Sequence, residues 1–238
     1  ESDEEAHSLG KNACRGSECT PMALTLGTFL KTVRDSGLPS SRHAFFMPTA
    51  TGPCRFGCYA LSQHMAMQRV GMGDVPILSP TSENSYLGLP VAARKAVWET
   101  MLCGDYITKL AQKTRPYELD PGETNRIIEA WVVRLEQDFE ARRDPRDTLA
   151  AAARALVRRP LRQERKPLVG VVGEIYVRSE PFSNAFVVDA IEKAGGEAWV
   201  SPIGEWILYT VWAQRKLAKA RGETLLERFA DEISNRFM

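Results

Sequence analysis

Four of the five cysteines stand in two close pairs, Cys14 with Cys19 and Cys54 with Cys58. Each pair lies in a polar loop with glycine or proline nearby, just before an apolar run with helical spacing. Such loops are poor places for core cysteines, and the sequence begins with no secretory signal that would favour disulfides. Thiolates are the usual protein ligands of soft metals. The pattern therefore predicts a metal or iron–sulfur site formed by these four cysteines.

Two arginines accompany these cysteines. Arg15 follows Cys14, and Arg55 follows Cys54. A neighbouring cation and a helix N-terminus both favour the thiolate form that binds metal. We therefore expect Arg15 and Arg55, together with backbone N–H groups at the helix starts, to stabilise an anionic metal centre.

The spacing alone leaves two kinds of metal centre open. A C-x4-C pair lies within the range of structural zinc sites, and iron–sulfur sites also tolerate it. The remaining candidate ligands are weaker. Cys103 lies among apolar residues of a helical run and is expected to pack there, His7 and His43 are expected at the surface, and His64 falls about three helical turns beyond Cys54.

Composition excludes several classes of partner. The chain has 238 residues and a formal net charge of +1, so no global field draws it to nucleic acid or to a membrane surface. No apolar run approaches the roughly 20 residues needed to span a bilayer. The first residues are acidic and lack both an initiator Met and a signal peptide. We expect a cytoplasmic protein whose N-terminus was cut from something longer.

Residues 1–90 are expected to form a cysteine-rich α/β lobe. A helix is predicted from Thr20 to Gly37, followed by a strand over 44–47, a helix over 54–70 and a strand over 75–78. This is one β-loop-α-β unit. Its second cysteine pair falls where the first strand ends, at the edge where open parallel sheets bind ligands.

Residues 91–166 are expected to form a helical segment with three amphipathic helices, and 167–238 an incomplete second α/β lobe. In that lobe, residues 168–177 are predicted as a strand buried on both faces. A loop over 178–184, a helix over 185–194 and a strand over 197–200 follow, with helical runs at 206–219 and 224–237. The fold class is α/β, with two Rossmann-like parallel-sheet lobes joined by a helical segment, truncated at both ends. Phe45 and Val171 are each expected in a central strand.

Three further features have two interpretations each. Gly170 and Gly173 form only part of a dinucleotide-binding fingerprint and lie inside the predicted strand, so nucleotide binding there is a weak signal. The basic residues between 154 and 166 are a solvated face and linker, or a surface for a phosphate-rich partner such as coenzyme A. The loop over 178–184 either lines a ligand cleft or is a capped turn in which Asn184 begins the next helix.

Several segments carry a family resemblance. Residues 10–21, with Cys14 and Cys19, and residues 45–57, with Cys54, resemble the 2-hydroxyacyl-CoA dehydratase and CoA-substrate-specific activase superfamily, in particular the cysteine-rich regions of its large fused members. Residues 169–184 and 202–206 are similar to the second α/β domain of that family. The resemblance covers about residues 10–90 and 167–212. It departs at Cys58, where that family often has Gln, and in having no ATPase phosphate-binding motif.

The resemblance implies a [4Fe-4S] or related cluster held by Cys14, Cys19 and Cys54, with electrons delivered by an ATP-dependent iron–sulfur activator of actin/Hsp70-like fold. It further implies a dehydratase-like or reductase-like activity on an acyl-CoA thioester or another small molecule, hence a lyase or an oxidoreductase. The alternative is a non-enzymatic structural or interaction module whose cysteines bind zinc.

Overall fold

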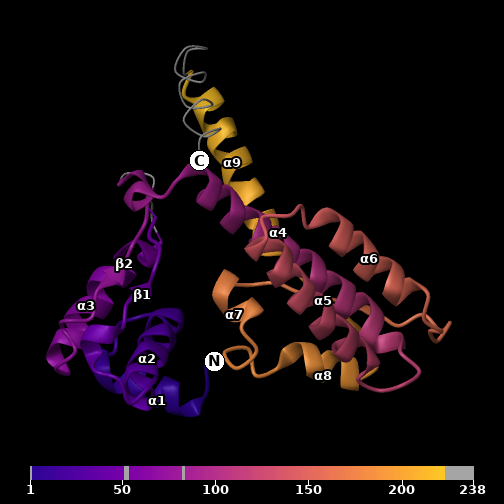
Figure 1. The fold of residues 1–238 in the computed structure, drawn as a ribbon, viewed down its shortest axis with the longest axis horizontal. Helices are drawn as coiled ribbons and strands as arrows, with labels where there is room; N and C mark the ends of the chain where they lie inside the picture. The colour runs from indigo at the N-terminus through magenta and orange to yellow at the C-terminus, as the bar shows by residue number, and fades with distance from the viewer. Residues whose placement is uncertain (1, 51–53, 82–83, 223–238) are drawn as a thin grey trace. The chain divides into compact units, whose positions relative to one another are not determined.

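The computed structural model describes residues 2–50, 54–81 and 84–222 (Figure 1). The chain divides into two compact units, Glu1–Leu89 and Pro90–Met238. We call the first the cysteine-rich unit and the second the helical unit, and each is described by itself. Among the described residues, no helix combines the length and the apolar character needed to cross a membrane.

The cysteine-rich unit contains three α-helices and one parallel pair of strands within its described residues. The helices are α1 (Glu4–Ala13), α2 (Thr20–Asp35) and α3 (Tyr59–Arg69), and the strands are β1 (Phe45–Phe46) and β2 (Ile77–Leu78). Short 3-10 turns, η1 (Ser40–Arg42), η2 (Arg55–Cys58) and η3 (Ser85–Gly88), lie between or after them. Phe45 pairs with Ile77 in parallel register, which confirms the predicted β-loop-α-β unit.

The core of this unit lies between α2, β1 and α3. Leu26 and Met67 have no solvent exposure, and Val75 fills the space beside them. The ring of Phe29 stacks on that of Phe45 with centroids 4.0 Å apart. Burial of this apolar face fixes α2 against the strand pair, and with it the loops at both ends of α2.

Helix α1, which the sequence reading did not anticipate, packs on α2 through backbone contact. A Cβ atom added at Gly10 would lie 1.8 Å from the carbonyl oxygen of Ala23, and one added at Gly27 would lie 1.6 Å from that of Ala6. The side chain of Asp3 caps α1 by accepting a hydrogen bond from the Ala6 N–H at 2.8 Å. The segment that contains His7 is therefore a folded helix, in which His7 is partly buried.

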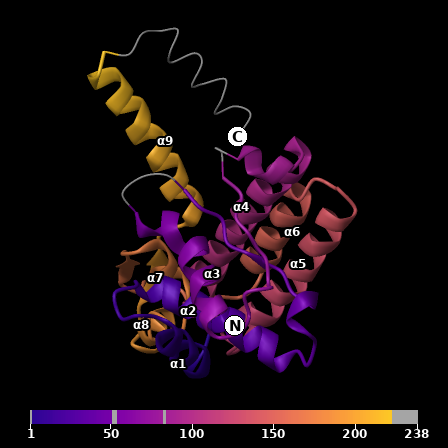
Figure 2. The same cartoon turned by 90° about the vertical axis from the view of Figure 1, so that its left-hand side faces the viewer.

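The helical unit begins with three packed helices, α4 (Val91–Thr114), α5 (Glu123–Glu140) and α6 (Arg146–Val157), which lie side by side in Figure 2. A 3-10 turn, η4 (Arg115–Tyr117), follows α4. Cys103 is buried in the core that these helices share, beside Leu135 and Ala152. All three helices fall within the segment predicted to be helical.

The rest of this unit carries the second parallel pair of strands. β3 (Leu168–Val171) pairs with β4 (Glu197–Val200), and α7 (Ile175–Ser179) and α8 (Val187–Lys193) lie between them in the chain. Helix α9 (Ile203–Ala220) follows β4. The predicted strand at 197–200 and the parallel pairing are confirmed, whereas the helical run predicted at 224–237 lies outside the described residues.

Two predictions for the first of these strands are wrong. The strand ends at Val171 instead of continuing to Val177, because Gly173 turns the chain at a φ of +141° and the Glu174 side chain then caps α7. It is also not buried on both faces, since Leu168 is 62% exposed. Within the described residues each sheet has two strands, so neither Phe45 nor Val171 occupies a central strand.

Candidate functional site

The four clustered cysteines all lie at helix ends in the cysteine-rich unit. Cys19, Cys54 and Cys58 are the N-cap residues of α2, η2 and α3. The sequence predicted only that both cysteine pairs lie near helix starts. Cys14 differs, because it follows the last turn of α1, where the helix dipole disfavours a negative charge. Cys54 and Cys58 are exposed, whereas Cys14 and Cys19 are partly buried.

The loop between Cys14 and Cys19 is folded around a single carboxylate. Three consecutive backbone N–H groups, those of Arg15, Gly16 and Ser17, donate to the side chain of Glu18 at 2.9–3.0 Å. Gly16 has a φ of +97°, which a residue with a side chain rarely adopts. Successive N–H groups that point to one place form an anion-binding concavity. These hydrogen bonds lower the pKa of Glu18.

The second cysteine segment lies against this loop. The guanidinium of Arg55 donates to the carbonyl oxygen of Ser17 at 2.6 Å. The sulfur of Cys19 lies 2.6 Å from the phenol oxygen of Tyr59, the residue that follows Cys58. Both cysteine pairs are therefore neighbours on one surface of the unit.

The local environments of the thiols differ. The Cys14 sulfur lies 3.7 Å from the sulfur of Met22. Burial raises the pKa of the Cys14 thiol, and the nearby carboxylate of Glu18 adds to this effect. At Cys54, the sulfur accepts a hydrogen bond from the Phe56 N–H at 3.5 Å.

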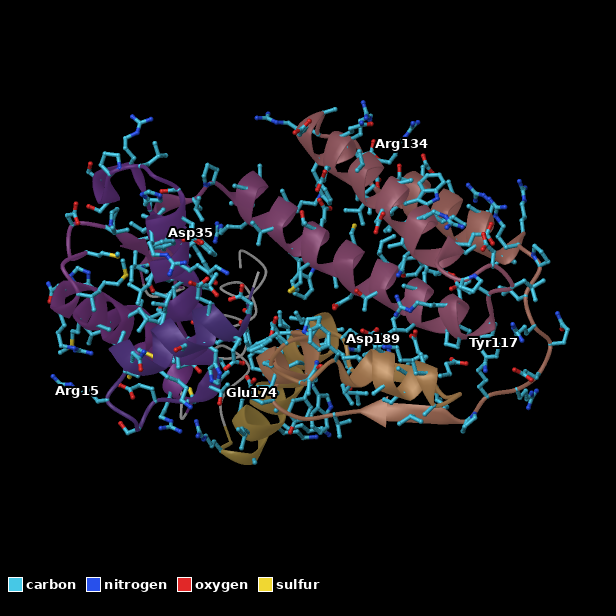
Figure 3. The ribbon with its side chains drawn as sticks, turned by 90° about the horizontal axis from the view of Figure 1, so that it is seen from below. Arg15, Asp35, Tyr117, Arg134, Glu174 and Asp189 are labelled. Atoms are coloured by element: carbon cyan, nitrogen blue, oxygen red, sulfur yellow. The ribbon has the colours of Figure 1, made fainter. Side chains whose placement is uncertain are left out.

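Within the described residues, the cysteines predicted as ligands are not grouped as a metal site. Among the described residues, no three His, Cys, Asp or Glu side chains lie close enough together to hold a metal ion. Ligation by Cys14, Cys19 and Cys54 at one centre stays a prediction. Of the arginines, Arg55 contacts the first cysteine loop, whereas the Arg15 side chain is exposed (Figure 3).

The histidines are engaged elsewhere. A ring nitrogen of His64 lies 3.1 Å from the amide nitrogen of Gln68, one turn further along α3. The His43 ring lies 3.1 Å from the carbonyl oxygen of Pro39.

Comparison of this chain with known proteins found no matching family model, no matching curated protein and no matching solved structure.

The helical unit contains a cavity that the sequence reading did not identify. It lies beyond the end of β4, beside the segment that follows β3. One wall is formed by α4, with Lys109, and by Arg115 at the start of η4. The loop predicted over 178–184 begins within α7 and continues to the turn before α8. Asn184 accepts a hydrogen bond from the Val187 N–H at 3.1 Å, as expected for a capped turn, and it also lines the cavity.

Proposed function

We propose that the cysteine-rich unit binds an iron–sulfur cluster, of the [4Fe-4S] type, and that the protein acts as an iron–sulfur redox component. The observation that supports this most directly is the contact between the two cysteine segments, made by Arg55 on Ser17 and by Tyr59 on Cys19. These contacts bring thiols of both segments to one surface of the unit.

The donor set fits such a cluster in kind. Thiolates are the ligands of iron–sulfur centres, and Cys14, Cys19 and Cys54 would supply three, with Cys58 nearby as a fourth. When bound, the cluster supplies one-electron transfer. The backbone N–H groups that now bind Glu18 are donors of the kind that stabilise an anionic centre, and Arg55 adds a positive charge beside them.

The family resemblance extends this proposal to partners and substrate. An ATP-dependent iron–sulfur activator of actin/Hsp70-like fold would deliver electrons, and an acyl-CoA thioester or another small molecule would receive them in a dehydratase-like or reductase-like reaction. A cytoplasmic location and Rossmann-like lobes belong to the same proposal. It involves neither nucleic acid nor a membrane.

A zinc-stabilised structural or interaction module is the second candidate. It is favoured by the partial burial of Cys14 and Cys19, which pack against the apolar core of their unit. A structural zinc ion contributes directly to folding, and its four ligands leave no open position.

Metal analysis of the full chain, purified without oxygen, separates the two candidates. Iron together with acid-labile sulfide, and a brown colour, supports the redox component, whereas one tightly bound zinc and no colour supports the structural module. If iron is found, mixing with a cognate activator, ATP and a reductant should change the redox state of the cluster. A colourless protein that binds neither metal after reconstitution would contradict both candidates.

A further inference from the structure

The cavity in the helical unit has the size and position of a ligand site. Its volume is about 600 Å³, within the range of small-molecule sites. Residues after β3, from Arg178 to Asp189, and residues after β4, from Val200 to Ile203, line it together with α4. Ligands of open parallel sheets bind at this edge, beyond the carboxyl ends of the strands.

Two cations in its wall, Lys109 and Arg178, contact the end of β4 and the residues that follow it. The ammonium of Lys109 donates to the carbonyl oxygen of Val200 at 2.8 Å and lies 3.3 Å from the ring centroid of Trp199. The guanidinium of Arg178 donates to the carbonyl oxygens of Gly173 at 3.1 Å and Pro202 at 3.3 Å. The Nε atom of Arg178 is buried without a hydrogen-bond partner. Both side chains therefore retain N–H groups that no acceptor occupies.

Two carboxylates, those of Asp105 and Glu205, lie close enough to Lys109 to act on its charge, but neither forms an ion pair with it. In the part of the chain that the structure describes, the ion pairs involve neither Lys109 nor Arg178. The Asp105 carboxylate, also in the cavity wall, accepts hydrogen bonds from the Ile203 and Gly204 N–H groups at 3.0 and 2.7 Å, and so caps α9.

The third cation of the wall differs, because Arg115 is paired with Glu192 at 2.6 Å. Asp189, labelled in Figure 3 and also in the wall, lies close enough to Arg115 to act on its charge. Burial lowers the pKa of Lys109.

The rest of the wall is largely apolar and carries unusual backbone geometry. Met101, Pro181 and Phe186 provide apolar surface. Ala185 and Phe186 both have a φ of +55°, although neither is a glycine. Such conformations cost about 1–3 kcal/mol each and cluster at ligand sites and active sites.

We propose that this cavity binds a small organic anion, whose carboxylate or phosphate oxygens contact Lys109 and Arg178 and whose apolar body packs against Met101 and Phe186. The oxygen atoms of the ligand accept hydrogen bonds from the N–H groups that have no acceptor, among them the buried Nε–H of Arg178. This proposal is independent of the metal centre, because none of its residues belongs to the cysteine-rich unit.

Calorimetric titration of the full chain with three matched probes tests the proposal. Benzoate and phenyl phosphate share an aromatic ring and differ in the anionic group, whereas benzyl alcohol keeps the ring without charge. We expect at least one of the two anions to bind, and benzyl alcohol to bind at least about tenfold more weakly because charge-assisted hydrogen bonds are lost. Tighter binding of phenyl phosphate identifies a phosphate ligand, and tighter binding of benzoate identifies a carboxylate.

Substitutions test whether Lys109 and Arg178 bind the anion. Lys109→Met and Arg178→Gln should each weaken anion binding about tenfold or more. Two control variants should leave binding unchanged. Lys113→Met removes an exposed lysine one turn further along α4, and Arg158→Gln removes an exposed arginine. Lys109→Arg, which keeps the charge, should retain binding and guards against a folding defect. Equal binding of benzyl alcohol, no binding of either anion at millimolar concentration, or equal losses in Lys109→Met and Lys113→Met would overturn the proposal.

Discussion

The sulfur of Cys19 and the phenol oxygen of Tyr59 lie 2.6 Å apart, although 40 residues separate them in the chain. Cys19 is the N-cap residue of α2, and Tyr59 is the first residue of α3, whose N-cap is Cys58. The contact therefore joins the starts of two helices that each have a cysteine at the N-cap. The ring of Phe56 meets that of Tyr59 edge-on, with centroids 5.4 Å apart. Tyr59 thus links the apolar core to the thiol surface.

Tyr59→Phe should lower the free energy of unfolding by about 1 kcal/mol, because it removes one partly buried hydrogen bond while the ring stays in place. Urea unfolding monitored by circular dichroism measures this change. Tyr106→Phe is the matched control, since Tyr106 is 45% exposed, and it should have little effect. Equal stabilities of the two variants would show that the contact contributes nothing to folding.

Cys54→Ser and Cys19→Ser should each remove most of the iron and colour from protein reconstituted with iron and sulfide, because the proposed cluster would lose one of its thiolate ligands. Cys103→Ser should bind as much iron as the unchanged protein, since Cys103 is buried in the core of the helical unit. Iron and sulfide analysis per protein chain gives the answer. Retention of full iron content by Cys54→Ser would remove Cys54 from the ligand set.

Alkylation of Cys14 should require a higher pH in the folded protein than in the unfolded chain. Burial raises the pKa of this thiol in the folded state, so folding favours the neutral form. The associated stability is fully present below the pKa of an unfolded cysteine, about 8.5, and is lost as the pH rises through the higher folded pKa. Iodoacetamide labelling with and without urea, followed by peptide mass spectrometry, compares the two midpoints. Coincident midpoints would contradict the prediction.

Gly27→Ala should lower the free energy of unfolding by about 3 kcal/mol or more, because the new methyl group would collide with a backbone carbonyl that cannot turn away. Gly104→Ala provides the control within another helix. A Cβ atom at Gly104 meets no atom within 4 Å. That variant should gain up to about 1 kcal/mol from the higher helix propensity of alanine. A stability loss of the same size in both variants would refute the close helix approach.

Local sequence signals predicted the elements whose burial depends on large apolar residues. Thr20, Pro21 and an apolar face with helical spacing predicted α2, and Gly195 with Gly196 marked the turn before β4. The same logic missed α1, which packs through small residues such as Ala6 and Gly10. A helix that approaches its neighbour at the backbone leaves no stripe of large side chains to detect.

The cavity could not be predicted for a different reason. In the sequence, nothing distinguishes Lys109 and Arg115 from ordinary solvated basic residues. Only the fold places the segments after β3 and β4 beside these two side chains and buries the charges. Likewise, Ile175 to Val177 have strand-forming side chains, yet Gly173 and the Glu174 cap make them helical.

The contact at Gly10 and Gly27 also determines how the thiols can be assembled. Backbone atoms resist compression far more strongly than side chains that can change rotamer, so α1 and α2 are held as one rigid body. Cys14 ends the first of these helices and Cys19 precedes the second, so their separation is preset before any metal arrives. In the proposed metal site, the segment with Cys54 and Cys58 would bind against this preset pair, and the entropic cost of ordering would fall on that half of the site.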